Sequence, residues 1–321
     1  MNPVVSEAPH LIDICPEIDS FRDKVREGLG QPQKALPPKF FYDARGSQLF
    51  DEITELPEYY LTRTEIGIMQ RYVGEMVARM GPHCLLVEYG SGSSIKTRIL
   101  LDHLTSPAGY VPIDISREHL LQSAATLTSL YPGLTVIPVC ADYSTEFNLP
   151  DTGGARTLVY FPGSTIGNFE PDQAQDFLRR IAGVVGPGGG LLIGVDLKKD
   201  VSVIEAAYND ARGVTEAFNK NMLARINREL GGTFELDRFA HRAFYDAEHG
   251  RVEMHLVSLD DQRVRIGDVE IRFHEHETIL TEYSYKYSLD DFAELASTSF
   301  DIEQVWTDDR QLFSVQELIA R

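Results

Sequence analysis

The chain has 321 residues, of which 43% are hydrophobic and 25% are charged. This length is about twice the commonest size of one domain, so one large or two medium domains are expected. The composition is that of a globular protein and excludes a disordered or collagen-like chain. The formal net charge of −19 argues against nucleic acid or an anionic membrane as the main partner, because binding phosphates requires a basic surface.

The cysteines and the N-terminal segment bear on the compartment. Cys15, Cys84 and Cys140 lie far apart with no CxxC spacing, which favours buried thiols in a reducing compartment over disulfides or a metal site. The N-terminal segment lacks the basic and apolar regions of a signal peptide. No apolar run approaches 18 residues, so no membrane span is predicted. We therefore expect a soluble cytoplasmic protein, with a monomer as the working hypothesis.

The first quarter of the chain is expected to contain helices and ordered loops. Residues 21–29 are predicted to form a short helix, and the proline- and aromatic-rich segment 31–65 an ordered region that lines a site. Thr62 and Glu65 fit a capping box. Apolar side chains at helical spacing then predict a long amphipathic helix, namely Ile66, Met69, Val73, Met76, Val77 and Met80.

The middle of the chain predicts a parallel sheet. Continuous apolar strands that alternate with helices are typical of a sheet covered on both faces. The predicted strands are 84–90, 109–116, 134–143, 156–168 and 186–197. A helical segment follows at 200–230, and residues 238–288 alternate like an antiparallel sheet. The terminal segment, 289–320, is predicted to be a helix and then short strands.

The junction after the first strand reads Glu88-Tyr89-Gly90-Ser91-Gly92-Ser93-Ser94. Glycines at the carboxyl end of a parallel strand let the backbone approach a ligand closely. Ile95 stands where a dinucleotide fingerprint would place its third glycine, which counts against NAD. A GxG alone is a weak signal.

Acids at the ends of three strands strengthen this signal. Asp114 closes the second strand, 24 residues after Gly90, where a carboxylate can accept both ribose hydroxyls. Asp142 and Tyr143 close the third strand, where the carboxylate suits the edge of an adenine and the aromatic ring its face. The simpler alternative is that each acid caps a following helix. As a set, with Glu88 before the loop, they resemble the adenosine pocket of class I S-adenosylmethionine-dependent methyltransferases.

Six segments narrow the resemblance to one family. They are LPPKFFYDARGSQLFDEITELPEYYLTRTE, VEYGSGSSIKTR, FPGSTIGN, YNDARGVTEAFNKN, RVEMHL and ETILTEYSYKYS. In this order, from about residue 25 to 290, they closely resemble the histidine-specific α-N-methyltransferases of ergothioneine biosynthesis. Leu61 replaces a frequent proline and Ser93 a usual threonine, and neither change removes a functional group. The resemblance implies transfer of three methyl groups from S-adenosylmethionine to the α-amino nitrogen of L-histidine. The product would be the betaine hercynine, in the first step of ergothioneine biosynthesis.

The resemblance also implies roles for individual residues. Those that would bind the cofactor are Gly90, Lys96, Asp114, Asp142 and Tyr143. Those that would bind the substrate are Tyr59, Glu282 and Ser284 at the imidazole, Asn168 and Tyr208 at the carboxylate, and Met254 as a pocket wall. Tyr42 would lie near the amino group as the candidate catalytic residue. No metal is implied, and none is suggested by His255, His274 and His276, which lack a further ligand.

The residues themselves leave alternatives open. Glu282 and Ser284 are two apart in an extended stretch and so share a face, where one acceptor and one hydroxyl suit two imidazole nitrogens. A solvated strand face in line with Lys286 is the alternative. Lys96 could instead be a solvated surface lysine. Asn168 could cap a helix that begins near Pro171, and Met254 could be plain core.

We therefore expect an α/β protein with a class I methyltransferase Rossmann-like parallel sheet and a second, discontinuous α+β substrate-binding lobe. The cofactor domain would comprise residues 63–198 and 287–321, and the substrate lobe 1–62 and 199–286, with histidine between them. Alternatives are a relative acting on another amino acid, such as tryptophan or tyrosine, and a non-catalytic S-adenosylmethionine-binding protein. A nicotinamide dehydrogenase is a more distant one.

Overall fold

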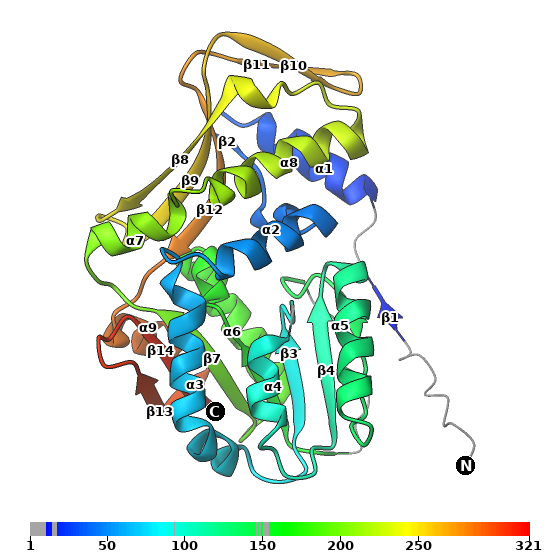
Figure 1. Ribbon diagram of the computed structural model, residues 1–321, viewed down its shortest axis with the longest axis vertical. Coiled ribbons are helices and arrows are strands. Elements are labelled where there is room, and N and C mark those ends of the chain that lie inside the picture. Colours follow the sequence, from blue (N-terminus) through cyan, green and yellow to red (C-terminus); the bar gives the residue numbers. More distant parts are fainter. Residues whose placement is uncertain (1–10, 15–17, 93, 146, 148, 150–153) are drawn as a thin grey trace.

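The computed structural model describes residues 11–14, 18–92, 94–145, 147, 149 and 154–321. A large sheet flanked by helices forms one part, and a smaller sheet with its own helices stands on one end of it (Figure 1). The chain passes between the two parts several times, so segments far apart in sequence meet where they join. Cys15 and Ser93 lie outside the described residues.

The large sheet has eight strands in the order β1-β5-β4-β3-β6-β7-β14-β13. The strands are β1 (Ile12–Asp13), β3 (Leu85–Tyr89), β4 (Gly109–Asp114), β5 (Val139–Cys140), β6 (Thr157–Phe161), β7 (Gly190–Asp196), β13 (Phe300–Thr307) and β14 (Phe313–Ala320). The neighbours from β1 to β7 pair in parallel, while β14 pairs antiparallel with both β7 and β13. The predicted α/β fold with a mostly parallel sheet is confirmed. The third strand is shorter than predicted, and the fourth ends at Phe161.

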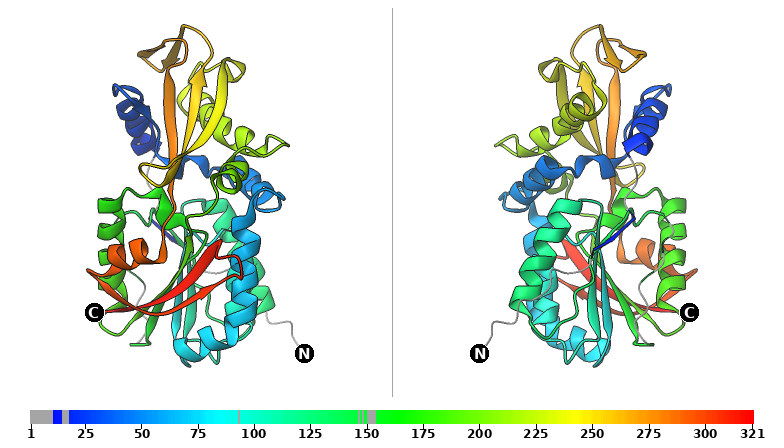
Figure 2. Two further views of the ribbon diagram at one scale, coloured as in Figure 1. Left: turned by 90° about the vertical axis from the view of Figure 1, so that its left-hand side faces the viewer. Right: turned by 90° about the vertical axis from the view of Figure 1, so that its right-hand side faces the viewer.

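Helices cover both faces of this sheet, as Figure 2 shows from two sides. On one face lie α3 (Tyr60–Met80), α4 (Ile95–Leu101) and α5 (Arg117–Leu130), and on the other α6 (Pro171–Val185) and α9 (Leu289–Ala296). Strand side chains alternate between the two cores: Leu86 and Tyr160 join the core with α3, whereas Val87 and Val159 join the one with α6. Every residue of β3 is buried, which explains why its residues are apolar or aromatic except for Glu88 at the end next to the glycine loop.

The start of α3 differs from the prediction. The helix begins at Tyr60 with Tyr59 as its N-cap, so Thr62 and Glu65 lie inside the first turns and the predicted capping box is wrong. Glu65 is fully buried. It occupies the apolar face of the helix together with Met69 and Met76, which are also buried. A buried carboxylate at such a position requires a partner, and this partner lies in the site described below.

The smaller sheet has the order β2-β12-β9-β8. Its strands are β2 (Lys34–Ala35), β8 (Phe239–Asp246), β9 (Arg251–Ser258) and β12 (Thr278–Tyr285), with a separate hairpin of β10 (Gln262–Ile266) and β11 (Val269–Phe273). The predicted antiparallel pairing is confirmed for β8, β9 and β12, while β2 joins β12 in parallel. The helical elements beside it are α1 (Ile18–Leu29), η1 (Pro38–Phe41), α2 (Ala44–Thr54), α7 (Val201–Tyr208), α8 (Val214–Leu230) and η3 (Leu236–Arg238).

One strand connects the two parts. β12 runs from the smaller sheet toward the large one, and Tyr287 just beyond it bridges to Leu197 after β7. The short helix η2 (Thr165–Asn168) packs closely against β12, because a Cβ at Gly167 would lie 2.7 Å from the carbonyl oxygen of Tyr285. The end of the large sheet and β12 therefore meet at a fixed contact.

The two described cysteines are in different chemical states. Cys84 is a buried free thiol, but Cys140 is disulfide-bonded, so the expectation of buried thiols is wrong at this position. Sequence spacing carried no sign of it, because residues distant in the chain can be brought together by the fold. In the described part of the chain, no helix is both long and apolar enough to cross a bilayer.

Candidate functional site

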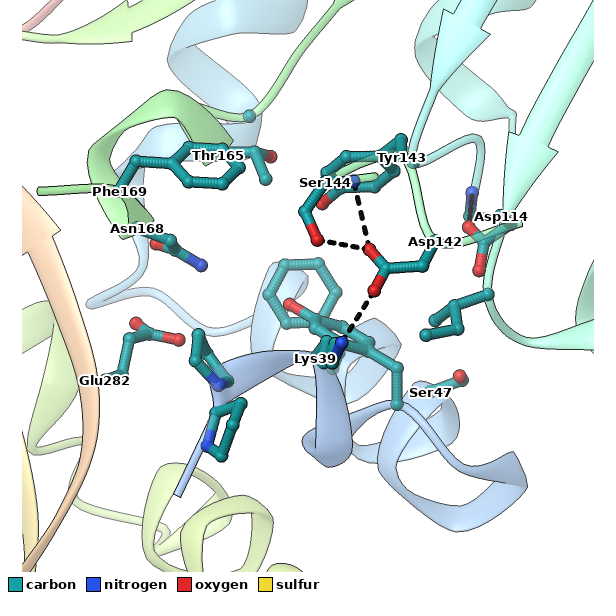
Figure 3. Close-up of a pocket in the computed structure, with 18 of the residues that line it drawn as sticks. Lys39, Ser47, Asp114, Asp142, Tyr143, Ser144, Thr165, Asn168, Phe169 and Glu282 are labelled. Carbon is teal, nitrogen blue, oxygen red and sulfur yellow. Dashed lines mark hydrogen bonds and ion pairs between the residues drawn. The ribbon is translucent and has the colours of Figure 1, made fainter. Parts of the chain in front are cut away.

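A cavity of about 800 Å³ lies where the two parts meet. Its lining comes from the loops after β3, β4, β5 and β6, from the segment that contains η1 and α2, and from β12. The carboxyl ends of parallel strands are where open α/β sheets bind ligands. In Figure 3, Asp114 and Asp142 come from the large sheet and Glu282 from β12, on opposite sides of the same space.

The glycine loop begins directly after β3. Gly90 has φ +74° and Gly92 φ +45°, a left-handed conformation that glycine adopts at little cost. Asp114 holds this loop, since its Oδ2 accepts a hydrogen bond from the Gly92 N–H at 3.0 Å and its Oδ1 one from the Ser116 N–H at 2.8 Å. Burial raises the pKa of Asp114. The carboxylate keeps further lone pairs for a ligand in the cavity.

Asp142 and Tyr143 lie on the same side of the cavity. Asp142 accepts hydrogen bonds from the N–H and hydroxyl of Ser144 and from Lys39 Nζ, the last at 2.6 Å (Figure 3). Burial alone would raise the pKa of Asp142, but these bonds outweigh it and hold the pKa below its usual value. The Tyr143 ring stacks on Tyr89 with the centroids 5.9 Å apart. Lys39 is a cavity residue that sequence reasoning missed.

Lys96 lines the cavity and is paired. Its Nζ lies 2.6 Å from Glu65 Oε2, and the Glu65 carboxylate also accepts the Gly163 N–H at 3.0 Å. The alternative of a solvated surface lysine is therefore wrong. Glu65 was missed as a site residue, although a glutamate in line with the apolar residues of a helix was an available signal. Glu88, which also lines the cavity, accepts a hydrogen bond from the Tyr110 hydroxyl, and burial raises its pKa to about 7.

Glu282 lies across the cavity from the cofactor residues. It pairs in register with Met254 on β9, next to a bulge between Leu280 and Glu282, and bulges redirect a side chain. Within the described residues its carboxylate has no hydrogen-bond or ion-pair partner, and burial raises its pKa to about 7 although Lys286 opposes this. An unpaired, desolvated acceptor that faces a cavity is suited to a ligand N–H.

Ser284 and Tyr208 are brought together behind Glu282. The Tyr208 hydroxyl donates to Ser284 Oγ at 2.8 Å. Lys286, whose side chain is fully buried, donates to both hydroxyl oxygens at 2.9 Å. The alternative of a solvated strand face is therefore wrong. Neither Ser284 nor Tyr208 is among the residues that line the cavity surface, and both are buried.

The other predicted substrate residues lie at different depths. Asn168 ends η2 and points into the cavity beside Glu282 (Figure 3). The N-cap of α6 is Glu170, so the alternative of Asn168 as the helix cap is wrong. Tyr42 and Tyr59 line the cavity, and each makes an edge contact with Phe50. Met254 is 2% exposed and belongs to the core behind the cavity lining.

The residues of the large sheet fit an adenosyl sulfonium ligand. Two carboxylates face the cavity from neighbouring strand ends, an aromatic ring lies beside the glycine loop, and a Cβ at Gly90 would lie only 3.7 Å from the Tyr143 ring. Acidic acceptors match ribose hydroxyls and an exocyclic amine, and the cavity lysines Lys39 and Lys96 are already paired with carboxylates. Among the described residues, no group of three metal-ligating side chains occurs.

Comparison with known proteins agrees with this geometry. The family model described as "Histidine-specific methyltransferase, SAM-dependent" matches residues 21–320. The chain is 43% identical to the histidine N-alpha-methyltransferase of Mycolicibacterium smegmatis, over 90% of this chain and 92% of that protein. It is 42% identical to the protein of the same name from Mycobacterium tuberculosis, over 95% and 96%. Among solved structures, the CcbJ methyltransferase from Streptomyces caelestis matches with a TM-score of 0.47 and 15% identity, over 79% of this chain and 96% of that one. The protein is an S-adenosylmethionine-dependent N-methyltransferase, and the chain belongs to the family of histidine-specific methyltransferases.

Proposed function

We propose that the protein transfers three methyl groups from S-adenosylmethionine to the α-amino nitrogen of L-histidine, giving hercynine in the first step of ergothioneine biosynthesis. The observation that carries the histidine assignment is Glu282, a carboxylate with a pKa raised to about 7 and with no partner among the described residues, which faces the cavity opposite Asp114 and Asp142. The two relatives described above bear histidine in their names, which supports the same substrate.

The substrate residues form two groups in this proposal. Glu282 accepts the imidazole N–H, with Ser284 and Tyr59 beside it. The carboxylate is assigned to Asn168 and Tyr208, and Met254 supports the pocket from behind. A site that hydrogen-bonds a ring nitrogen rejects analogues that leave its polar groups unpaired. An indole ring has one N–H that could donate to Glu282 but no ring acceptor for the Ser284 hydroxyl, which disfavours tryptophan.

The cofactor residues are Gly90, Lys96, Asp114, Asp142 and Tyr143. Asp114 is assigned to the ribose hydroxyls, and Asp142 with Tyr143 to the adenine. Lys96 is assigned to the cofactor site, where it forms an ion pair with Glu65, which also accepts a hydrogen bond from the Gly163 N–H. When bound, S-adenosylmethionine supplies an electrophilic methyl group on a positively charged sulfur.

The chain's own residues prepare the amine for in-line attack. An α-ammonium must lose its proton before it can react, and removal from water together with a nearby positive charge lowers its pKa. Tyr42 aligns the nitrogen rather than removing its proton, because burial and the neighbouring Glu282 carboxylate raise the pKa of this phenol. The imidazole and carboxylate contacts keep the amino acid in place while the nitrogen exchanges protons for methyl groups. A trimethylated nitrogen has no proton left to lose, so transfer stops there.

The domain organisation, compartment and assembly state belong to the same proposal. Residues 63–198 and 287–321 form the cofactor domain, and 1–62 and 199–286 the substrate lobe, with histidine held between them. β1, at Ile12–Asp13, is the part of the N-terminal segment that pairs with the large sheet. A cytoplasmic location and a monomer are proposed as well. The disulfide at Cys140 removes the thiol argument for a reducing compartment, so cell fractionation is the test of location.

The deciding experiment is incubation of the purified protein with S-adenosylmethionine and each of the twenty amino acids, followed by mass spectrometry. A gain of three methyl groups on histidine alone is the expected result. Trimethylation of another amino acid would overturn the assignment of Glu282 and Ser284 while leaving the reaction class intact. Binding of the cofactor without any product would favour a non-catalytic binding protein.

A further inference from the structure

Lys286 lies just beyond β12 and is fully buried. Its Nζ contacts three oxygen atoms, each at 2.9 Å: Asp196 Oδ2, the Tyr208 hydroxyl and Ser284 Oγ. An ammonium group has three N–H donors and no acceptor, so these contacts use all of them. Burial would lower the pKa of Lys286, but the Asp196 carboxylate and the Tyr208 hydroxyl together outweigh it and raise that pKa above the usual value. The side chain therefore stays charged.

The two hydroxyls beside Lys286 have few protons to offer. Tyr208 and Ser284 each have one hydroxyl proton, and one of these two protons forms the hydrogen bond between them. Because Lys286 can only donate, both oxygens must accept from it. One hydroxyl proton therefore remains for a ligand. With Tyr208 donating to Ser284, Ser284 Oγ already accepts two hydrogen bonds, and the remaining proton is its own.

Glu282 is two residues before Ser284 on the same strand and lines the cavity, where no described residue forms a hydrogen bond or ion pair with its carboxylate. The Glu282 carboxylate also contributes to raising the pKa of Tyr208, so the two groups interact electrostatically. We propose that Lys286 is a positioning residue of the amino-acid pocket, which turns Ser284 into a hydrogen-bond donor next to the acceptor Glu282. This inference rests on the proposed function.

One donor and one acceptor in this arrangement match a neutral imidazole, which carries one N–H and one bare nitrogen. Tyr208 then has no proton left for a carboxylate while it donates to Ser284. The substrate carboxylate must therefore accept hydrogen bonds from other donors, such as the Asn168 amide. Alternatively, Tyr208 donates to the carboxylate, and Ser284 then donates to Tyr208 and no longer to the imidazole. Lys286 thus couples the binding of the imidazole to the binding of the carboxylate of histidine.

The chain offers a matched control in Lys199. Its side chain is also buried and paired with Asp196, but it contacts the Tyr60 hydroxyl at 2.6 Å instead of Tyr208 and Ser284. Replacing either lysine by methionine removes one ammonium from the same carboxylate. A general loss of packing or charge balance should therefore affect Lys286→Met and Lys199→Met alike.

The experiment measures the dissociation constants of histidine and S-adenosylmethionine by calorimetry for the wild type and both variants. Lys286→Met is expected to weaken histidine binding by about tenfold or more, the usual loss when a pair of ordered hydrogen bonds is removed, with cofactor binding changed by less than about twofold. Lys199→Met is expected to retain histidine affinity within about threefold. Unchanged histidine affinity in Lys286→Met, or an equal loss in both variants, overturns the inference.

A pH profile separates positioning from a structural role. The groups that interact with Glu282 are Lys286 just beyond the end of its strand and the tyrosines Tyr42, Tyr59 and Tyr208 from other segments. Lys286 opposes the rise of the Glu282 pKa, so in Lys286→Met the pH midpoint of histidine binding should move upward by about half a unit or more relative to wild type. An unmoved midpoint contradicts the inference.

Two further outcomes are informative. If Lys286→Met does not fold, Lys286→Gln replaces it, because an uncharged amide has two donors and cannot satisfy three oxygens; the same expected and contradicting results apply. If the wild type binds cofactor but not histidine, the proposed function fails and this inference with it. If the wild type binds histidine and the Lys286 variants bind it equally well, only the inference fails.

Discussion

Lys39 Nζ lies 2.6 Å from Asp142 Oδ2, and this ion pair joins the N-terminal segment to the end of β5 inside the cavity. The other oxygen of Asp142 is held by Ser144. In this conformation both oxygens of the carboxylate proposed for the adenine are already in use. A lysine from the substrate side of the cavity thus stands at the proposed cofactor site.

The Lys39 pair leads to a prediction about cofactor affinity. Lys39→Met should tighten S-adenosylmethionine binding by about two- to fivefold, because it frees Asp142 and removes a positive charge that repels the sulfonium. The loss of the ion pair should cost little folding stability, since a partly exposed pair contributes only about 0–1 kcal/mol. Calorimetric titration measures the change. Lys24→Met is the control, since Lys24 lies at the cavity but pairs with Glu27. Weaker cofactor binding in Lys39→Met would show that the lysine supports the site instead.

Glu282→Ala tests the assignment of the imidazole acceptor. Histidine affinity should fall by about 2–3 kcal/mol, the cost of losing a charge-assisted hydrogen bond, while cofactor affinity should stay nearly unchanged because the two sites lie on opposite sides of the cavity. Separate titrations with each ligand measure both effects. An equal loss of both affinities would refute the assignment.

The raised pKa of Glu282 predicts that its ionised carboxylate destabilises the ligand-free folded protein at high pH. Its pKa of about 7 exceeds the unfolded value of about 4.3, so its contribution favours the folded state below pH 4 and is lost as the pH rises through 7. Glu282→Gln should therefore raise the melting temperature of the ligand-free protein at pH 8 by roughly 2–5 °C, or about 1–2 kcal/mol, and have little effect at pH 4. Thermal unfolding at both pH values measures this. A variant that is less stable than wild type at pH 8 would argue that the carboxylate is paired.

Tyr42→Phe tests alignment of the nitrogen. The edge contacts of the ring with Phe50 and Phe218 are retained in the variant, so histidine and cofactor affinities should change little. The methyl-transfer rate should fall by about tenfold or more, since misplacing a nucleophile is costly. Single-turnover kinetics measure the rate directly. Full activity in the variant would defeat the proposed role. A pH profile that followed the ionisation of Tyr42 would instead make the phenol a base.

The elements of the large sheet were predictable because buried parallel strands leave continuous apolar runs in the sequence. Their carboxyl ends then bring Gly90, Asp114 and Asp142 together without further information. The strand lengths were less predictable: the third strand is only Val139–Cys140, because the length over which it pairs with its neighbours β1 and β4 is decided by tertiary contacts. The disulfide at Cys140 left no pattern in the sequence.

The charged residues inside the fold were the hardest to predict. Glu65, Lys96 and Lys286 are read from sequence as helix-cap or surface residues, because most charged side chains are exposed. Their burial depends on partners from other segments, such as Gly163 for Glu65 and Asp196 for Lys286. Alternation along β12 predicts a shared face for Glu282 and Ser284, but it gives no sign that Lys286 donates to Ser284 in a buried cluster.

Gly167 tests whether the contact between η2 and β12 holds the substrate side of the cavity. A Cβ there would lie 2.7 Å from the Tyr285 carbonyl oxygen and 3.1 Å from its nitrogen, so Gly167→Ala must push η2 away from the strand and move Asn168 with it. Overpacking of this kind costs about 1–3 kcal/mol. The melting temperature should fall, and histidine affinity should fall by about threefold or more while cofactor affinity is retained. Gly183→Ala is the matched control, because Gly183 lies in α6 with nothing within 4 Å of its Cβ position. That variant should gain about 0.5–1 kcal/mol from better helix propensity and bind histidine as wild type does. If Gly167→Ala also bound histidine normally despite a lower melting temperature, the η2 contact would serve the fold alone, and the position of Asn168 would not depend on it.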